Sequence, residues 1–215
     1  STTWENGGAI IPTVLALISE STAKTSGATS ITQSHTIADN SLRLLVAFSL
    51  TRSAPPSSGS TGTTSVTYDG IPLTFAAAVD SNYSSYDISV WYLINPPVGT
   101  ADVISTYNAS AQGALQVFDF KNADIGTPLR TIVSEGASGS GTYTADLAPT
   151  TVAGDIVVDF INAADNATLT VGAGQTQVAN DETGSSGTHS QFASSHETAS
   201  GVSTTMSWSV STNDH

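Results

Sequence analysis

Histidines and carboxylates are the residues of this chain whose types could do chemistry, and few of them are spaced for it. His189 and His196 flank the stretch SQFASS, and Glu197 follows directly. Along an extended strand their separation spans about 23 Å, so they could share a zinc ion only around a tight turn. Because a zinc site needs three or four convergent ligands, we expect these to be exposed loop histidines.

Acidic turns at two matched points of the chain offer the oxygen ligands that calcium prefers. Asp80 follows one apolar run, and Asn180, Asp181 and Glu182 follow another in the second half of the chain. The EF-hand spacing D-x-D-x-D-G does not occur. Calcium and an ordinary acidic turn are both compatible with this pattern, and we expect no other cofactor.

The usual sequence signatures of catalytic carboxylates and serine triads are missing. Glycoside hydrolysis needs two carboxylates that face one sugar bond, but the stretch VFDFKNAD carries Asp119 alone on a strand. There is no G-x-S-x-G motif, and four scattered histidines in a serine-rich chain do not indicate a triad. We therefore expect a protein that is not an enzyme.

Aromatic side chains raise the alternative of carbohydrate binding, in which an exposed ring stacks on a sugar. Tyr83 and Tyr86 lie in the polar stretch DSNYSSYD, and Trp91 stands on an apolar run before a double proline. Binding residues are common in loops, whereas a tryptophan on an apolar strand more often belongs to the core. The predicted glycan site comprises Tyr83, Tyr86 and Trp91, and core packing is the alternative.

Composition and charge limit the partners. The chain has 215 residues with 18 acidic and five basic side chains, a formal net charge of −13 and no cysteine. That charge argues against a phosphate backbone or an anionic membrane as partner. No run approaches the roughly 18 apolar residues of a membrane-spanning helix. The first 20 residues lack the basic region and A-x-A site of an intact signal peptide.

The elements that must position these residues are β-strands. No window shows helical periodicity with matching caps. The stretches LRLLVAFSL and GDIVVDFI are continuously apolar, which predicts central strands covered on both sides. Strand-like runs separated by turn residues are expected at 12–19, 30–37, 42–50, 64–69, 72–79, 87–94, 101–107, 113–120, 129–134, 142–147, 155–161, 167–172, 175–179, 189–195 and 203–210.

Side chains alternate between the two faces of each strand. In GALQVFDF this places Leu115 and Asp119 on one face and Phe118 on the other, and in DISVWYL it separates Trp91 from Tyr92. Short strands at this spacing, with almost no helix, predict an all-β, antiparallel sandwich or barrel. We expect a β-sandwich of jelly-roll type.

The two halves of the chain, about 13–109 and 113–210, resemble each other in order. HTIADNSLRLLVAF (35–48) parallels PTTVAGDIVVDF (149–160), and YDISVWYL (86–93) parallels THSQFASS (188–195). We predict one domain, residues 1–215, in which two similar halves close a common core. Generic strand patterning, or two separate sandwiches with one per half, are the alternatives.

Five stretches of the chain resemble a β-sandwich module that is common in bacterial surface and secreted proteins and in tailed-phage structural proteins: SVTYDGIPLTFAAAV, SVWYLINPPVGTADV, GALQVFDFKNADIGTPL, AGDIVVDF and GAGQTQ. The resemblance covers roughly residues 13–209. It implies a display, adhesion or virion-surface role without catalysis, and it supplies no catalytic residues. The second half departs from the pattern, since it has neither the Trp-Tyr pair nor the Pro-Pro step.

The apolar segment AIIPTVLALIS near the N-terminus is either the first strand or a strand that inserts into a neighbouring subunit. In the second case the subunit contact would be made by Ile10, Ile11, Val14, Leu15 and Leu17.

We expect a structural protein at a virion surface or outside the cell, most simply a phage decoration or appendage protein. Its partners would be copies of itself and other virion or surface proteins, with neither nucleic acid nor membrane among them. A secreted carbohydrate-binding or adhesin module is the main alternative. An extracellular filament subunit joined by N-terminal strand exchange is another.

Overall fold

The computed structural model describes residues 14–52, 62–80, 86–134, 141–163, 167–184 and 189–212. Within these ranges every regular element is a β-strand and all strand pairs are antiparallel, which confirms the all-β class. The strands are β1 (Ala16–Ile37), β2 (Leu44–Arg52), β3 (Thr63–Tyr68), β4 (Ile71–Pro72), β5 (Thr74–Asp80), β6 (Tyr86–Ile94), β7 (Gly99–Lys121), β8 (Gly141–Leu147), β9 (Ile156–Ala163), β10 (Thr168–Val171), β11 (Thr176–Thr183), β12 (Ser190–Thr198) and β13 (Met206–Thr212).

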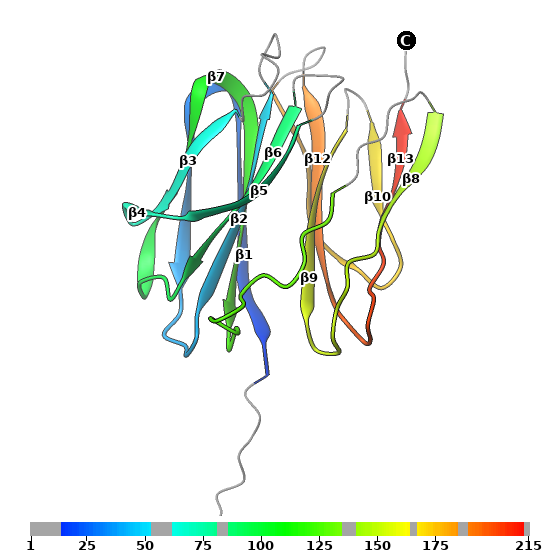
Figure 1. Ribbon diagram of the computed structural model, residues 1–215. Helices are drawn as coiled ribbons and strands as arrows, with labels where there is room; N and C mark the ends of the chain where they lie inside the picture. Colours follow the sequence, from blue (N-terminus) through cyan, green and yellow to red (C-terminus); the bar gives the residue numbers. More distant parts are fainter. Residues whose placement is uncertain are drawn as a thin grey trace, which may run out of the picture.

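The first half, β1 to β7, forms one seven-stranded sheet in the order β4-β3-β7-β2-β6-β5, with β1 paired to β7. β1 and β7 contain 22 and 23 residues, so each joins two of the shorter strands predicted from the sequence. Their pairing shifts register around Thr25 and Ala28. The two long strands bend over at one end (Figure 1), so that the sheet folds back onto itself.

Turn residues account for two of the corners. Asp69 and Gly70 connect β3 to β4 with φ values of 50° and 75°, the left-handed pair that an Asp-Gly hairpin turn requires. β6 ends before Asn95, which has φ 49°, and Pro96 and Pro97 follow without backbone donors to extend the strand. The predicted strand–turn–strand corner between 87–94 and 101–107 is therefore confirmed.

The second half, β8 to β13, forms two three-stranded sheets, β10-β13-β8 and β11-β12-β9. Figure 1 shows these sheets standing beside the folded sheet of the first half, with β9 and β12 nearer to it and β13 and β8 farther away. The molecule is thus a stack of β-sheet layers, which supports its β-sandwich character.

Residues 129–134 do not form the strand predicted from the sequence. Arg130 and Thr131 bind Asp155 and the carbonyl oxygen of Thr150 through their side chains, and no strand of the described residues pairs with this segment. The segment is therefore an extended crossing from the first half to the second, tied down by side chains instead of a backbone ladder.

Apolar cores fill the spaces between successive layers. The first core lies inside the folded sheet, the second between the first half and the β11-β12-β9 sheet, and the third between the two small sheets. Leu45 and Ala47 of β2 face the first core, whereas Val46 and Phe48 face the second. β2 is therefore buried on both sides, as its unbroken apolar sequence predicts. β9 likewise contributes Phe160 to the second core and Ala163 to the third.

Candidate functional site

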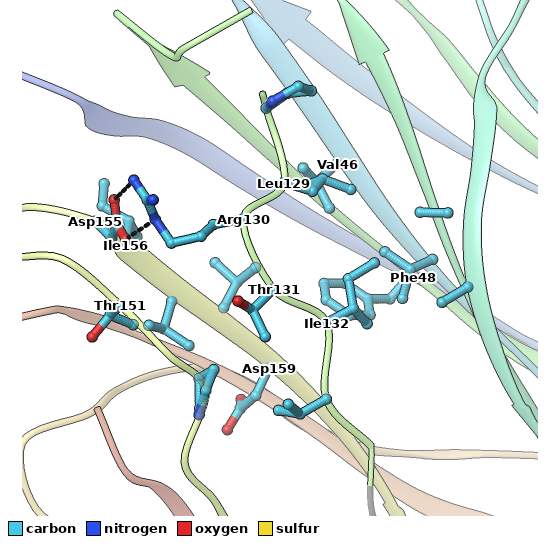
Figure 2. Close-up of a pocket in the computed structure, with 18 of the residues that line it drawn as sticks. Val46, Phe48, Leu129, Arg130, Thr131, Ile132, Thr151, Asp155, Ile156 and Asp159 are labelled. Carbon is cyan, nitrogen blue, oxygen red and sulfur yellow. Dashed lines mark hydrogen bonds and ion pairs between the residues drawn. The ribbon is translucent and has the colours of Figure 1, made fainter. Parts of the chain in front are cut away.

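An apolar cleft of about 460 Å³ lies between the two halves. Val46 and Phe48 of β2 line one wall, together with Ile88 and Val90 of β6. The other wall consists of Ile156 to Phe160 of β9. Figure 2 shows Leu129 to Ile132 crossing in front of the cleft between these walls. A concave apolar site with a few polar groups is the usual form of a binding pocket.

The polar rim of the cleft is an ion pair that ties the crossing segment to the second half. Arg130 Nε donates to Asp155 Oδ2 at 2.8 Å, and Nη2 lies 3.5 Å from Oδ1. The backbone N–H of Val152 donates to the same carboxylate at 2.8 Å. The arginine is thus already neutralised at the rim, and exposed aliphatic side chains of Ile132 and Val133 stand next to it.

Asp159 is a buried carboxylate on the β9 side of the cleft. It accepts hydrogen bonds from Trp208 Nε1, from the backbone and hydroxyl of Ser195, and from Gln175 Nε2. Burial raises its pKa above the ordinary value of 3.8, although the Ser195 and Trp208 donors act in the opposite direction. Four donors that converge on one carboxylate indicate a structural hub between β9, β12 and β13.

A second polar cluster lies inside the first half, between the two limbs of β1. Ser21 Oγ is 2.8 Å from His35 Nδ1, and His35 Nε2 is 3.3 Å from Asp119 Oδ1. Ser19 Oγ also donates to Asp119. His35 and Asp119 are buried, whereas Ser19 and Ser21 are half-buried. A serine, a histidine and a carboxylate are therefore connected in series.

Comparisons with known proteins assign no function to this chain, so the function is argued from the geometry described above. No family model matches the chain, and no curated protein or solved structure matches it. In the parts of the chain that the structure describes, no helix is long and apolar enough to cross a membrane.

Two of the three residues of the predicted glycan site, Tyr86 and Trp91, are buried. Trp91 is 8% exposed, belongs to the first core and donates its Nε1 hydrogen to Ser89 Oγ at 2.9 Å. Tyr86 is also buried, and Arg52 lies over its ring at 5.3 Å from the centroid. Neither ring can stack on a sugar, so the prediction is wrong for these two residues. Tyr83 lies outside the described residues.

The predicted acidic turn is part of a strand, and its side chains have separate protein partners. Asn180 donates to the carbonyl oxygen of Leu169, and Asp181 pairs with Lys24 at 2.6 Å. Glu182 lies 3.2 Å from His189. Asp80 ends β5, and its side chain is outside the description. Among the described residues no three His, Asp or Glu side chains are grouped to hold a metal ion.

The expectation that both histidines are exposed is wrong, because His189 is buried and His196 is half-buried. His189 directly precedes β12, whereas His196 pairs with Val158 and Thr176 towards its far end. The two imidazoles therefore stand at opposite ends of one strand.

The five residues of the predicted N-terminal subunit contact have three different outcomes in the structure. Leu15 and Leu17 pack against the second core of their own chain, and Leu17 pairs with Phe120. These two residues are therefore internal, which corrects their assignment to a neighbouring subunit. Val14 is 67% exposed, and Ile10 and Ile11 lie outside the described residues.

Sequence reasoning missed the Ser21–His35–Asp119 series. The available signal was the position of Asp119 on the same strand face as Leu115, because a carboxylate on an apolar face needs a polar partner. The partner comes from the other limb of β1. Only the bend of that strand brings the imidazole and the carboxylate together.

Proposed function

We propose that this protein is a structural subunit on the surface of a particle, as a decoration or appendage protein of a phage virion. Copies of the chain associate through one apolar face, and the role rests on contacts instead of catalysis. The observation that carries the proposal is a group of exposed aliphatic side chains beside the cleft between the halves. We call this group the cleft face; it comprises Ile132, Val133 and Val152.

The cleft face is apolar and well exposed. Ile132, Val133 and Val152 are 43%, 40% and 46% exposed. Thr131 donates to the carbonyl oxygen of Thr150, so the two segments that carry these side chains lie against each other. Grouped apolar side chains on a protein surface mark interaction sites, and Ile132 and Val133 also line the apolar cleft.

Charge favours a second copy at this face over a charged partner. The chain carries a formal charge of −13, so copies repel each other at long range. At the cleft face, however, Arg130 and Asp155 neutralise each other. Two such faces can therefore meet without local repulsion, and the apolar area that they bury supplies the attraction.

The fold that we propose for this role is a jelly-roll type sandwich built from two similar halves. The support is that β5, β6 and β2 pair in the same order as β11, β12 and β9. The resemblance to surface and phage structural modules, which covers nearly the whole chain, supports the particle context.

Sedimentation velocity over a range of protein concentrations tests the association. The wild type is expected to form a defined oligomer at micromolar concentration. Ile132→Ser combined with Val133→Ser is expected to shift it towards the monomer. Ile71→Ser in β4 is the matched control, because Ile71 is 38% exposed but lies on the first half away from the cleft. A monomeric wild type, or an unchanged oligomer in the double variant, would contradict the proposal.

Deletion of residues 1–13 separates this model from N-terminal strand exchange. An oligomer that survives the deletion assigns the contact to the cleft face, whereas its loss assigns the contact to strand exchange. The genes beside the coding sequence test the particle context. Capsid or tail genes support a virion protein, and their absence favours a secreted module.

A further inference from the structure

The Ser21–His35–Asp119 series in the first half has no part in the proposed structural role. We propose that Ser21 is an activated nucleophile that accepts the acyl group of small carboxylic esters, with His35 as its general base. This activity goes beyond the proposed function and stands independently of it, because the cluster lies inside the folded sheet of the first half, away from the cleft face.

The two imidazole nitrogens face different partners, which fixes the direction of proton transfer. An ionised Asp119 carboxylate can only accept hydrogen bonds, so the His35 nitrogen 3.3 Å from it, Nε2, carries the hydrogen. Nδ1 then presents its lone pair to the Ser21 hydroxyl at 2.8 Å. Asp119 is a positioning residue that holds the tautomer. A base oriented by a third group and in hydrogen-bond reach of a hydroxyl is the arrangement that activates a serine.

Solvent exposure decreases from the serine to the histidine and the carboxylate, so the nucleophile is the most accessible member of the series. Ser21 is half-buried, whereas His35 and Asp119 are each 3% exposed. β1 pairs with β7 alone among the described strands, so it forms the open edge of the folded sheet. Every second backbone N–H of an edge strand points outward, and groups of this kind can stabilise an oxygen that becomes negative during acyl transfer.

The surroundings of the series fit a short, uncharged acyl group. Ala101 pairs with His35 across β1 and β7, and Ala23 lies two residues from Ser21 on the same strand face. Both alanines pack against the first core. Ser21 itself pairs with the fully buried Val117. The hydroxyl is therefore bordered by close-packed apolar side chains, which favour a short, uncharged acyl group over a charged or bulky one.

Acyl transfer to Ser21 and its hydrolysis need no cofactor. Ser21 Oγ forms a bond to the carbonyl carbon while its proton passes to His35 Nδ1. The bond between that carbon and the ester oxygen breaks, and the departing alkoxide takes the proton from His35. Water then attacks the acyl-serine in the same way, which releases the carboxylic acid and restores Ser21.

Labelling of the full chain with diisopropyl fluorophosphate, followed by intact mass measurement and peptide mapping, tests the proposal. Ser21 Oγ binds phosphorus and fluoride leaves. We expect one adduct per chain, located on Ser21, while the exposed Ser30 of the same strand stays unmodified. His35→Gln is expected to be labelled at least about 100-fold more slowly, the usual contribution of a general base.

Matched variants keep this test independent of folding. Ser21→Ala removes the hydrogen-bond partner of the buried His35 Nδ1, so it should lower the unfolding midpoint, remain folded in the labelling buffer and lose the adduct. Ser30→Ala should be labelled like the wild type. Wild-type protein that remains unlabelled at Ser21, or a folded His35→Gln variant that is labelled at the wild-type rate, would overturn the proposal.

Discussion

The two halves of the molecule pair their strands in the same order and complete their sheets differently. β5, β6 and β2 of the first half correspond to β11, β12 and β9 of the second, and β3, β7 and β1 correspond to β10, β13 and β8. In the first half, β7 runs on past β3 to pair with β2 as well, so that one sheet folds over its own core. In the second half, the three-stranded sheets have no pairing with each other among the described residues.

Because of this difference, the β11-β12-β9 sheet of the second half relies on packing against the first half. β9 pairs with β12 on one side, and no described strand pairs with its other side. Its apolar face instead packs against β2 of the first half through Phe160, which stacks on Phe48 with ring centroids 5.8 Å apart. Phe160 also stacks on Phe192 at 5.8 Å. We expect this aromatic stack to join the halves into one unit that unfolds cooperatively.

Removing one ring of this stack should produce the largest change in the free energy of unfolding. Phe192 is fully buried in the second half, so Phe192→Ala is expected to lower the free energy of unfolding by about 3–5 kcal/mol. Urea denaturation followed by circular dichroism measures the change. Phe118→Ala, at an equally buried position of the first half, should cost a similar amount. Phe75→Ala, at a 49% exposed position, is the control and should cost much less.

The next largest change in the free energy of unfolding is expected at Asp159, a carboxylate of the second half that has no counterpart in the first half. Asp159 precedes Phe160 in β9, whereas Ala47 precedes Phe48 in the matched position of β2. Asp159→Ala leaves four donors without their acceptor, and we expect a loss of about 1–3 kcal/mol near neutral pH.

The pH dependence of this effect has a definite sign. Burial raises the pKa of Asp159 in the folded chain above 3.8, so the folded state binds its proton more tightly than the unfolded state. The stability that this provides is present below about pH 3.8 and is lost as the pH rises through the raised pKa. Urea titrations at a series of pH values should therefore show the wild type losing stability relative to Asp159→Ala over that range. Parallel curves would contradict this.

Removing the ion pair between the halves should produce the smallest change in the free energy of unfolding. Lys24 Nζ lies 2.6 Å from Asp181 Oδ1, but the two side chains are 45% and 49% exposed. Solvent screens such pairs, so Lys24→Ala is expected to cost less than about 1 kcal/mol.

The same variant has a spectroscopic readout. Partial burial alone would raise the pKa of Asp181, but Lys24 and the backbone N–H of Glu182 together lower it below 3.8. Lys24→Ala should therefore raise the pKa of the Asp181 carboxyl, which a carbon-13 NMR titration detects. An unchanged pKa would show that the pair does not form in solution.

Local patterns of the sequence predict most of the strands and their faces. The unbroken apolar run of β2 correctly predicts burial on both sides, and the alternation in GALQVFDF correctly separates Leu115 from Phe118. The pattern does not reveal that the runs predicted at 12–19 and 30–37 belong to one continuous strand from Ala16 to Ile37, because the polar residues between them look like a loop. Nor does it predict that 129–134 stays outside a sheet, since pairing depends on a partner edge.

The candidate sites are harder to predict because they depend on contacts between distant segments. The cleft forms where Val46 meets Ile156, and the chemical series forms where Asp119 meets His35. Neither pair is marked by a spacing along the chain. Trp91 is the opposite case: it is conspicuous in the sequence as a possible binding residue, but it packs inside the first core.

Native-state hydrogen exchange at increasing urea concentration tests the cooperative unit most directly, because it reports on each strand separately. The most protected amides of β2 in the first half and of β12 in the second are the ones to compare. We predict that both sets exchange with the same opening free energy and the same dependence on urea, since the aromatic stack couples the halves. Amides of β12 that open at clearly lower free energy while β2 stays protected would contradict the account.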